Sequence, residues 1–286
     1  MTMNIDWMAQ ATELGEAIAY LGLFAGILLI AKWLKDLWTP YSIAHELTKA
    51  DNPAIGLEMS GYFLAAAFVF IGALTGESKS FLQDFSLVAG YSFLGILMLN
   101  VSRLVMDKFL FHKFCSVKEV IEDRNIGVAS VRFGLYLATG AIAGASIHGQ
   151  GGGVDTAVIF FILGQVVLIL FSKIYELLTP YSVHKEIEEE NVAAGIAMGG
   201  TLVAFGIIIA AAAHADFVSW TYNLIVFAEL AISGMILLVF VRFFMDKLIL
   251  VGDDLNREIS EDKNLAAGFV EATIAVAFAI VLAILL

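Results

Sequence analysis

Two stretches of this chain carry nearly the same polar phrase. Residues 39–56 read TPYSIAHELTKADNPAIG and residues 179–195 read TPYSVHKEIEEENVAAG. Both phrases stand between long apolar segments of the 286-residue chain. A repeat of this kind predicts that one structural corner is built twice, and therefore that the chain contains a duplicated unit.

The composition places this unit in a membrane. Sixty per cent of the residues are hydrophobic and 15% are charged, whereas a soluble domain carries about 25% charged residues. Several apolar stretches reach the roughly 20 residues that a bilayer-spanning helix needs. We predict an all-α polytopic membrane protein with eight spans, at residues 13–37, 54–75, 82–110, 126–147, 155–178, 192–213, 217–250 and 265–286.

The basic residues predict the orientation. Lys and Arg gather around the first, third, fifth and seventh connections, and of 16 basic residues only Lys79 falls on the other side. Basic residues concentrate in cytoplasmic loops and at the adjoining ends of spans. We therefore expect the odd-numbered loops in the cytoplasm, both termini outside, and a location in a bacterial inner membrane.

The duplication extends over two halves, which we place at residues 1–147 and 148–286. SRLVMDK at 102–108 matches VRFFMDK at 241–247. Arg103 and Arg242 each stand 22 residues before an asparagine, Asn125 and Asn264 respectively. Each half thus predicts a four-helix membrane unit.

A finer repeat lies inside each half. Four spans open with an asparagine beside acidic residues and before small ones, in DNPAIG (51–56), DRNIGVA (123–129), EENVAAG (189–195) and DKNLAAG (262–268). The four asparagines are Asn52, Asn125, Asn191 and Asn264. We predict a two-helix hairpin used four times, with all four copies pointing the same way.

These openings have a direct physical interpretation. An asparagine side chain accepts a hydrogen bond from an otherwise unpaired amide of the first helical turn. Pro53 suits the first helical position, where no amide hydrogen bond is lost. Small residues let helices approach closely in lipid. The four asparagines are therefore predicted helix caps, and an architectural role explains them without a functional one.

Taken together, the TPYS turn, Arg103, Arg242 and the four asparagine openings resemble the bacterial inner-membrane family known as domain of unknown function 350, the YjfL-like proteins. The resemblance covers essentially the whole chain, which looks like two fused copies of a four-span member. NIGVAS departs from the pattern because Ala129 replaces the glycine of the other openings. The resemblance implies a multi-pass inner-membrane protein tied to envelope stress, and it supplies no catalytic residue.

The spatial order of the hairpins stays open at this point. Each hairpin has an even number of spans, so the inverted repeats of many secondary transporters are absent. Four parallel hairpins are compatible with a pseudo-fourfold ring or with two halves that mimic a dimer. The half-length relatives favour the pseudo-dimer.

Ionisable residues inside spans are candidates for function, because they are costly in lipid. Glu58, Arg132 and Glu271 lie six or seven residues after their capping asparagines, or roughly 9–10 Å along each helix. Around a common axis these three would meet, with Arg103 and Arg242 nearby. The set forms either a buried ion network that fixes helix register or a pathway for protons or ions.

Two further polar residues lie in the middle of predicted spans. Glu229 lies 13 residues before Arg242, and Gln165 lies in the fifth span. The two side chains are expected either to hydrogen-bond to each other or to face a hydrated cavity. Glu229 is the single residue expected to be most informative about function.

Other classes of function find little support. The chain has no nucleotide-binding loop and no HExxH, GxSxG or CxxC motif. His148, His214, Asp155 and Asp216 fall near the outer surface, but their spacing matches no metal-ligand pattern. A net charge of −12 disfavours nucleic-acid binding. We expect no catalytic residue, no metal and no cofactor.

Three functions remain at this stage. The first is a structural or regulatory membrane protein, surrounded by membrane lipids, whose cytoplasmic loops bind a protein partner or whose copies form a homo-oligomer. The second is a channel or transporter for protons or small ions. The third, a membrane-embedded enzyme, is the least favoured. A continuous hydrated cavity would indicate the second, and a dry core with Glu58 paired to Arg132 would indicate the first.

Overall fold

The computed structural model of the chain describes residues 7–75, 80–110, 116–148, 151–244 and 254–285. Within these ranges it contains eight long helices and four short ones, and no strand. The long helices are α1 (Trp7–Leu37), α3 (Pro53–Leu74), α4 (Phe81–Leu110), α6 (Ile126–Ile147), α7 (Val154–Leu178), α9 (Val192–Ala213), α10 (Trp220–Phe244) and α12 (Leu265–Leu285). The short helices are α2 (Ile43–Thr48), α5 (Ser116–Ile121), α8 (Val183–Glu188) and α11 (Leu255–Ser260).

All eight long helices are long and apolar enough to cross a bilayer. The prediction of an eight-span helical membrane protein is therefore confirmed. The last part of the predicted seventh span, residues 245–250, lies outside the described residues. Each hairpin consists of a long entering helix, a short helix and a long returning helix, and four such hairpins follow one another along the chain.

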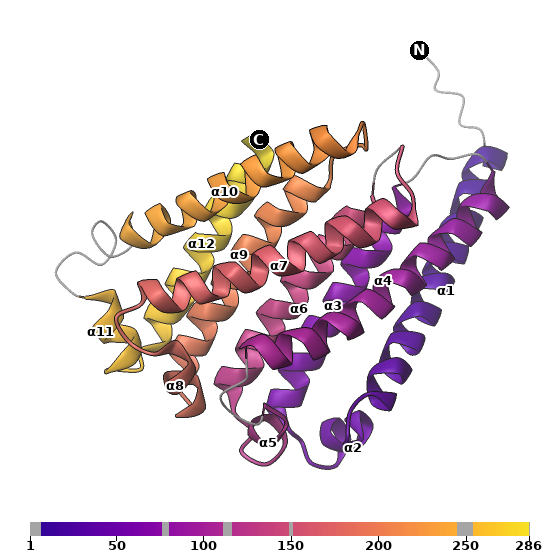
Figure 1. Ribbon diagram of the computed structural model, residues 1–286. Helices are drawn as coiled ribbons and strands as arrows, with labels where there is room; N and C mark the ends of the chain where they lie inside the picture. The colour runs from indigo at the N-terminus through magenta and orange to yellow at the C-terminus, as the bar shows by residue number, and fades with distance from the viewer. Residues whose placement is uncertain (1–6, 76–79, 111–115, 149–150, 245–253, 286) are drawn as a thin grey trace.

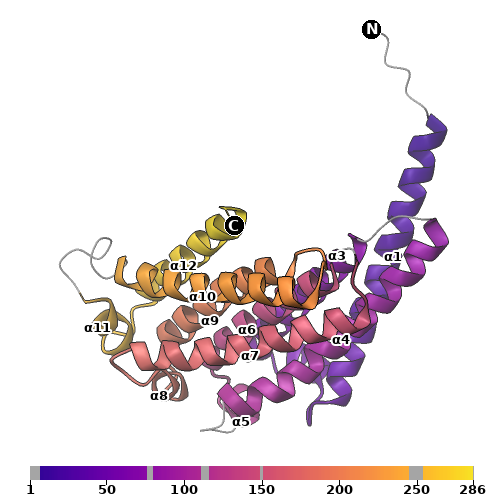
Figure 2. The ribbon, with the colours of Figure 1, turned by 45° about the horizontal axis from the view of Figure 1, so that its top comes forward.

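The hairpins form two layers and an open row (Figure 1). The returning helices α3, α6, α9 and α12 pack side by side in chain order, with extensive contact between each consecutive pair. The entering helices α1, α4, α7 and α10 form the second layer, which Figure 2 shows in front of the row. The pseudo-fourfold ring is wrong as an arrangement, because the returning helices form an open row in which the contact between the halves, α6 with α9, continues the same packing.

Glycines allow the returning helices to approach closely. A Cβ added at Gly134 would lie 2.1 Å from the carbonyl oxygen of Gly199, and one added at Gly200 would lie 2.2 Å from the Cβ of Ala272. Because these neighbours are backbone or short side chains, a larger residue has nowhere to go. Close backbone contact of this kind replaces the hydrophobic driving force that is missing between helices in lipid.

The repeated TPYS phrase builds the corner between an entering helix and a short helix. The Thr39 hydroxyl donates to the carbonyl of Lys35 at 3.1 Å, and the Thr179 hydroxyl donates to the carbonyl of Tyr175 at 3.3 Å. Proline then follows, which cannot continue the helical hydrogen bonding. The serine that ends the phrase caps the next helix, since Ser42 caps α2 and Ser182 caps α8.

The four short helices lie along one end of the bundle, which we call the loop side, and α1 begins and α12 ends at the opposite end, the turn side (Figures 1 and 2). At each corner of the loop side, the residue before the capping asparagine has a left-handed backbone conformation. These residues are Asp51, Arg124, Glu190 and Lys263, with φ between 47° and 59°. Such a conformation is uncommon for residues other than glycine, so all four hairpins make the same constrained turn.

Candidate functional site

The four asparagines cap the returning helices. The side-chain oxygen of Asn125 accepts from the amide of Val128 at 3.1 Å, and that of Asn191 accepts from the amide of Ala194 at 3.1 Å. Asn52 and Asn264 make the corresponding bonds to first-turn amides. The side-chain nitrogen of each asparagine donates to a glutamate of the preceding short helix, which joins the corner to the span; these glutamates are Glu46, Glu119, Glu186 and Glu258.

The same side-chain nitrogens also connect successive hairpins. Asn52 donates to the carbonyl of Val120 at 2.9 Å, Asn125 to that of Ile187 at 2.7 Å, and Asn191 to that of Ile259 at 2.8 Å. Each acceptor lies in the short helix of the following hairpin. Asn52, Asn125 and Asn191 therefore act as both helix caps and links along the row, and this second role was not predicted.

A buried ion cluster, cluster one, lies between α1, α3 and α6. Glu58 is fully buried and accepts from Lys35 Nζ at 2.8 Å and from Arg132 Nη1 at 2.7 Å. Lys35 and Arg132 are also buried. One carboxylate thus separates two cations, and each of its oxygens accepts one charge-assisted hydrogen bond.

Cluster one continues toward α4. Arg132 Nη2 donates to Asp107 Oδ1 at 2.9 Å, and Arg103 Nε lies 3.9 Å from the second oxygen of Asp107. Arg103 also donates to the carbonyl of Trp38 at 3.1 Å. The side chains of Lys35, Glu58, Arg132, Asp107 and Arg103 therefore form one continuous chain of charges from α1 to α4.

Aromatic rings close the cluster on its apolar side. Lys35 Nζ lies 4.7 Å from the ring centre of Tyr62 and 4.4 Å from that of Tyr136. Both distances are within the range of cation–π attraction. Lys35 was not among the predicted site residues, although its position inside the first predicted span, at residues 13–37, could have marked it as an intramembrane charge.

A second, smaller cluster lies in the other half of the chain. In cluster two, Arg242 Nη1 donates to Glu271 Oε1 at 2.7 Å, and Arg242 Nη2 donates to Asn256 at 2.8 Å. The Tyr175 hydroxyl donates to the same oxygen of Glu271 at 3.2 Å, and its ring lies 5.0 Å from the guanidinium carbon of Arg242. Glu271 therefore does not meet Glu58 and Arg132, as a common axis would have required, because the helices form an open row.

The TPYS tyrosines lie beside these clusters. Burial, followed by the charge of Glu58, raises the pKa of Tyr41. Burial, followed by the charge of Glu271, raises the pKa of Tyr181 to about 12. The repeated phrase thus places one neutral phenol next to the buried carboxylate of each half.

Gln165 and Glu229 do not contact each other. Gln165 Oε1 accepts from the Ser102 hydroxyl at 2.5 Å and from the Thr139 hydroxyl at 3.4 Å, so it joins α7 to α4 and α6. Glu229 is exposed on α10, and no hydrogen bond or ion pair reaches it from the described residues. The expectation that the two groups bond to each other is therefore wrong, and a hydrated cavity beside them stays a prediction.

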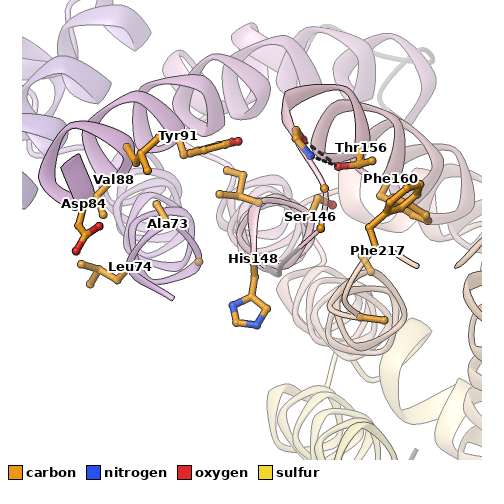
Figure 3. A pocket seen from close by; sticks show the side chains of 18 of the residues that line it. Ala73, Leu74, Asp84, Val88, Tyr91, Ser146, His148, Thr156, Phe160 and Phe217 are labelled. Atoms are coloured by element: carbon orange, nitrogen blue, oxygen red, sulfur yellow. Dashed lines mark hydrogen bonds between the residues drawn. The ribbon is translucent and has the colours of Figure 1, made fainter. Parts of the chain in front are cut away.

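A cavity of about 520 Å³ opens on the turn side (Figure 3). Tyr20, Asp84, His148, Thr156 and Phe217 are among the residues that line it. Its lining includes none of the charged residues of cluster one or cluster two. The cavity is thus a local feature of the turn side, separate from the buried ion clusters.

Two histidines stack next to this cavity. The rings of His148 and His214 have centres 3.7 Å apart and planes inclined by 7°, and His148 Nδ1 contacts the Thr75 hydroxyl. Burial, followed by the positive charge of His214, lowers the pKa of His148. Among the described residues no group of three or more His, Cys, Asp or Glu side chains is placed to bind a metal ion.

The fold and the buried clusters define the class of the molecule, a multi-pass membrane protein built from repeated two-helix hairpins. The chain belongs to the family described as Domain of Unknown Function (DUF350), whose model matches twice, at residues 8–147 and 151–286. It is 24% identical over 205 residues to a protein described as a UPF0719 transmembrane protein from Aquifex aeolicus (strain VF5), covering 68% of this chain and 75% of the relative. No solved structure matches the chain.

Proposed function

We propose that this protein is a non-conducting membrane scaffold that presents the loop side to a protein partner in the cytoplasm of a bacterium. The observation that carries the proposal is the pairing of Glu58 with both Arg132 and Lys35 in a fully buried position. A carboxylate that relays ions or protons needs a path of water or hydrogen bonds to both sides of the membrane, whereas Glu58 is 0% exposed and its two oxygens accept from Lys35 and Arg132.

The packing around the clusters supports the same conclusion. A cavity of about 20 Å³ adjoins Glu271 and Arg242, and one of about 10 Å³ adjoins Arg103 and Arg132. Spaces of this size hold about one water molecule at most. A scaffold needs a rigid core of this kind, and buried charge-assisted hydrogen bonds such as those of Glu58 to Lys35 and Arg132 fix how helices pack.

The orientation follows from the charge distribution. Lys49, Lys118, Lys185 and Arg257 lie in or directly beside the four short helices of the loop side. Because basic residues favour the cytoplasmic side, we assign the loop side to the cytoplasm and the turn side to the exterior.

The loop side offers a regular surface for a partner. Its four short helices lie in a row, and acidic side chains outnumber basic ones along it. The end of α8 and the turn after it are the most acidic part, and Glu188, Glu189 and Glu190 there are exposed. A partner with a basic surface is the one that such a row would attract, because complementary charge steers association.

Two experiments test the proposal. The first is a measurement of ion and proton flux in liposomes, in which we expect no flux through the folded protein. The second is photocrosslinking in cells from Glu122 and Glu189, with Ser219 on the turn side as the matched control. We expect one protein with a basic surface to be captured from both loop-side positions and not from Ser219. Equal labelling from all three positions would contradict a dedicated partner on the loop side.

A further inference from the structure

The row of returning helices repeats three kinds of contact along its internal junctions, one of them at all three junctions and each of the others at two. Counted from the capping asparagine, the first contact joins position 2 of one helix to position 4 of the next, as Gly127 does with Gly195 and Ala193 with Gly268. Each glycine approaches the backbone of the preceding helix so closely that an added Cβ would lie 2.4–2.7 Å from a carbonyl oxygen. This contact is one rung of a repeating interface.

The second rung joins position 9 of one helix to position 8 of the next. Its three copies are Gly61 with Phe133, Gly134 with Gly199, and Gly200 with Ala272. The third rung joins position 13 to position 15, as Ala65 does with Gly140 and Ala138 with Gly206. Every helix in the row thus has a forward face, at positions 2, 9 and 13, and a backward face, at positions 4, 8 and 15.

The forward face of α12 is uncovered. Its residues at positions 2, 9 and 13 are Ala266, Thr273 and Ala277, and all three are exposed. The equivalent alanines of α3 at positions 2 and 13, Ala54 and Ala65, are buried under α6. The last helix of the row therefore keeps alanine at positions 2 and 13, with Thr273 in place of the glycine at position 9, although no described residue packs against this face.

The backward face of α3 is partly uncovered, with Ser60 exposed and Gly56 and Ala67 partly exposed. Gly56, Ser60 and Ala67 occupy positions 4, 8 and 15. A Cβ added at Gly56 would meet nothing within 4 Å, whereas one at the equivalent Gly195 would meet backbone. By contrast, the lipid-exposed positions of α3 carry large residues such as Leu64 and Ile71. An edge that met only lipid would have no need of small side chains.

A polar contact is also left unmade at the same edges. Three asparagines donate to a carbonyl in the short helix of the next hairpin, but Asn264 donates only to Glu258 among the described residues. The equivalent acceptor in the first hairpin is the carbonyl of Leu47, directly after Glu46, and no described donor reaches it. A donor on one edge and its matching acceptor on the other are therefore both unused.

We infer that these two edges bind each other in successive copies of the chain, so that α12 of one copy packs against α3 of the next. The occupant of each edge is a second copy because both faces present mostly small residues at the positions that join neighbouring helices within the row. Thr273 stands where the three internal junctions have Gly61, Gly134 and Gly200, so the contact between copies is wider at the second rung. Such a contact is heterologous, and it extends as a ring or as an open array. Within one copy, α1 lies beside α4 of the next hairpin. In the contact between copies, α10 of the first copy would lie beside α1 of the second copy in the same way.

The second rung provides the sharpest test, because Thr273 of one copy would lie against Ser60 of the next. Both tolerate replacement by cysteine, which is close to them in size. In a Cys115→Ser background, we would oxidise native membranes that contain Ser60→Cys, Thr273→Cys or both. We expect a ladder of dimers and larger species from the double variant, and no crosslink from either single variant.

Controls separate this contact from random collision. Coexpression of the two single variants should give dimers only, because each copy then carries one reactive edge. Ser60→Cys combined with Ile236→Cys should give monomers, since Ile236 is 66% exposed on the other layer. Labelling with N-ethylmaleimide confirms that each thiol reacts.

Two results would overturn the inference. Crosslinking of Thr273→Cys alone would show a symmetric contact between two α12 helices. Absence of any ladder from the double variant, with both thiols reactive, would show that lipid covers these edges. Native mass spectrometry of the protein without cysteine substitutions, extracted in mild detergent, gives an independent measure and should show species larger than a monomer.

Discussion

Arg132 and Glu271 occupy the same position of the repeat, seven residues after Asn125 and Asn264, and they carry opposite charges. Arg132 pairs with Glu58 of the preceding returning helix, whereas Glu271 pairs with Arg242 of its own hairpin. The duplicated position has thus kept a buried charge and exchanged its sign and its partner. Each half contains a self-contained cluster, and both clusters join neighbouring helices.

Loss of the carboxylate in cluster one should destabilise the protein. Glu58→Gln leaves Lys35 and Arg132 as buried cations without their shared counter-charge. Breaking a buried pair by removal of one partner costs about 3–5 kcal/mol. We expect a clear fall in the thermal unfolding temperature in detergent.

The matched control is the same substitution on α10, Glu229→Gln. Because Glu229 is exposed and makes no ion pair with the described residues, we expect its unfolding temperature to stay at or slightly above that of the parent. Equal losses from Glu58→Gln and Glu229→Gln would contradict the structural role assigned to cluster one.

Cluster two should tolerate the loss of both partners better than the loss of one. Arg242→Leu leaves Glu271 as an unpaired buried carboxylate, and Glu271→Leu leaves Arg242 without its main acceptor. In the double variant no uncompensated charge of the pair remains, and such replacements are often close to neutral. A double-mutant cycle should therefore show a coupling of more than about 1 kcal/mol, and additive losses would count against a specific pair.

The close contact between α6 and α9 should be sensitive to a single methyl group. In Gly134→Ala the new Cβ would overlap the carbonyl of Gly199, so the helices must separate. Overpacking of this kind costs about 1–3 kcal/mol. Gly90→Ala on α4 is the control, because nothing lies within 4 Å of its added Cβ. Unfolding in detergent measures the stability of both variants. If Gly134→Ala is as stable as Gly90→Ala, then α6 and α9 do not touch at this position.

The turn side should lose stability in mild acid. The pKa of His148 is lower in the folded protein than in the unfolded chain, so the unfolded chain binds the proton first as the pH falls. Stability is therefore full above the ordinary histidine pKa of about 6.5 and decreases below it. We expect the parent to lose more thermal stability between pH 7.5 and pH 5.5 than His148→Asn does. An identical loss in both would rule out His148 as a source of the pH dependence.

Much of the architecture could be predicted because the relevant signals are local. The spans follow from apolar length, and the caps at Asn52, Asn125, Asn191 and Asn264 follow from the chemistry of the first helical turn. The repeat itself is visible at Arg103 and Arg242, whose surroundings are nearly identical.

The spatial order of the helices could not be predicted, because in a membrane both lipid-facing and buried positions are apolar. The spacing of apolar residues therefore does not show which face of a helix is buried against its neighbours. For this reason the exposed position of Glu229 and the buried position of Gln165 could not be distinguished from the sequence. The small residues do contain the missing information, since Gly127, Gly195 and Gly268 recur at fixed positions. Their partners become evident only when the row is seen in three dimensions.

The central claim, that the buried charges are structural and the protein conducts no ions, is tested most directly by ion and proton flux in liposomes. The purified parent would be compared with Glu58→Gln and Glu229→Gln under pH gradients, ion gradients and applied voltage. We predict no flux above that of empty liposomes for the folded parent. Flux through the parent that Glu58→Gln abolishes would contradict the claim and would identify cluster one as a conducting pathway.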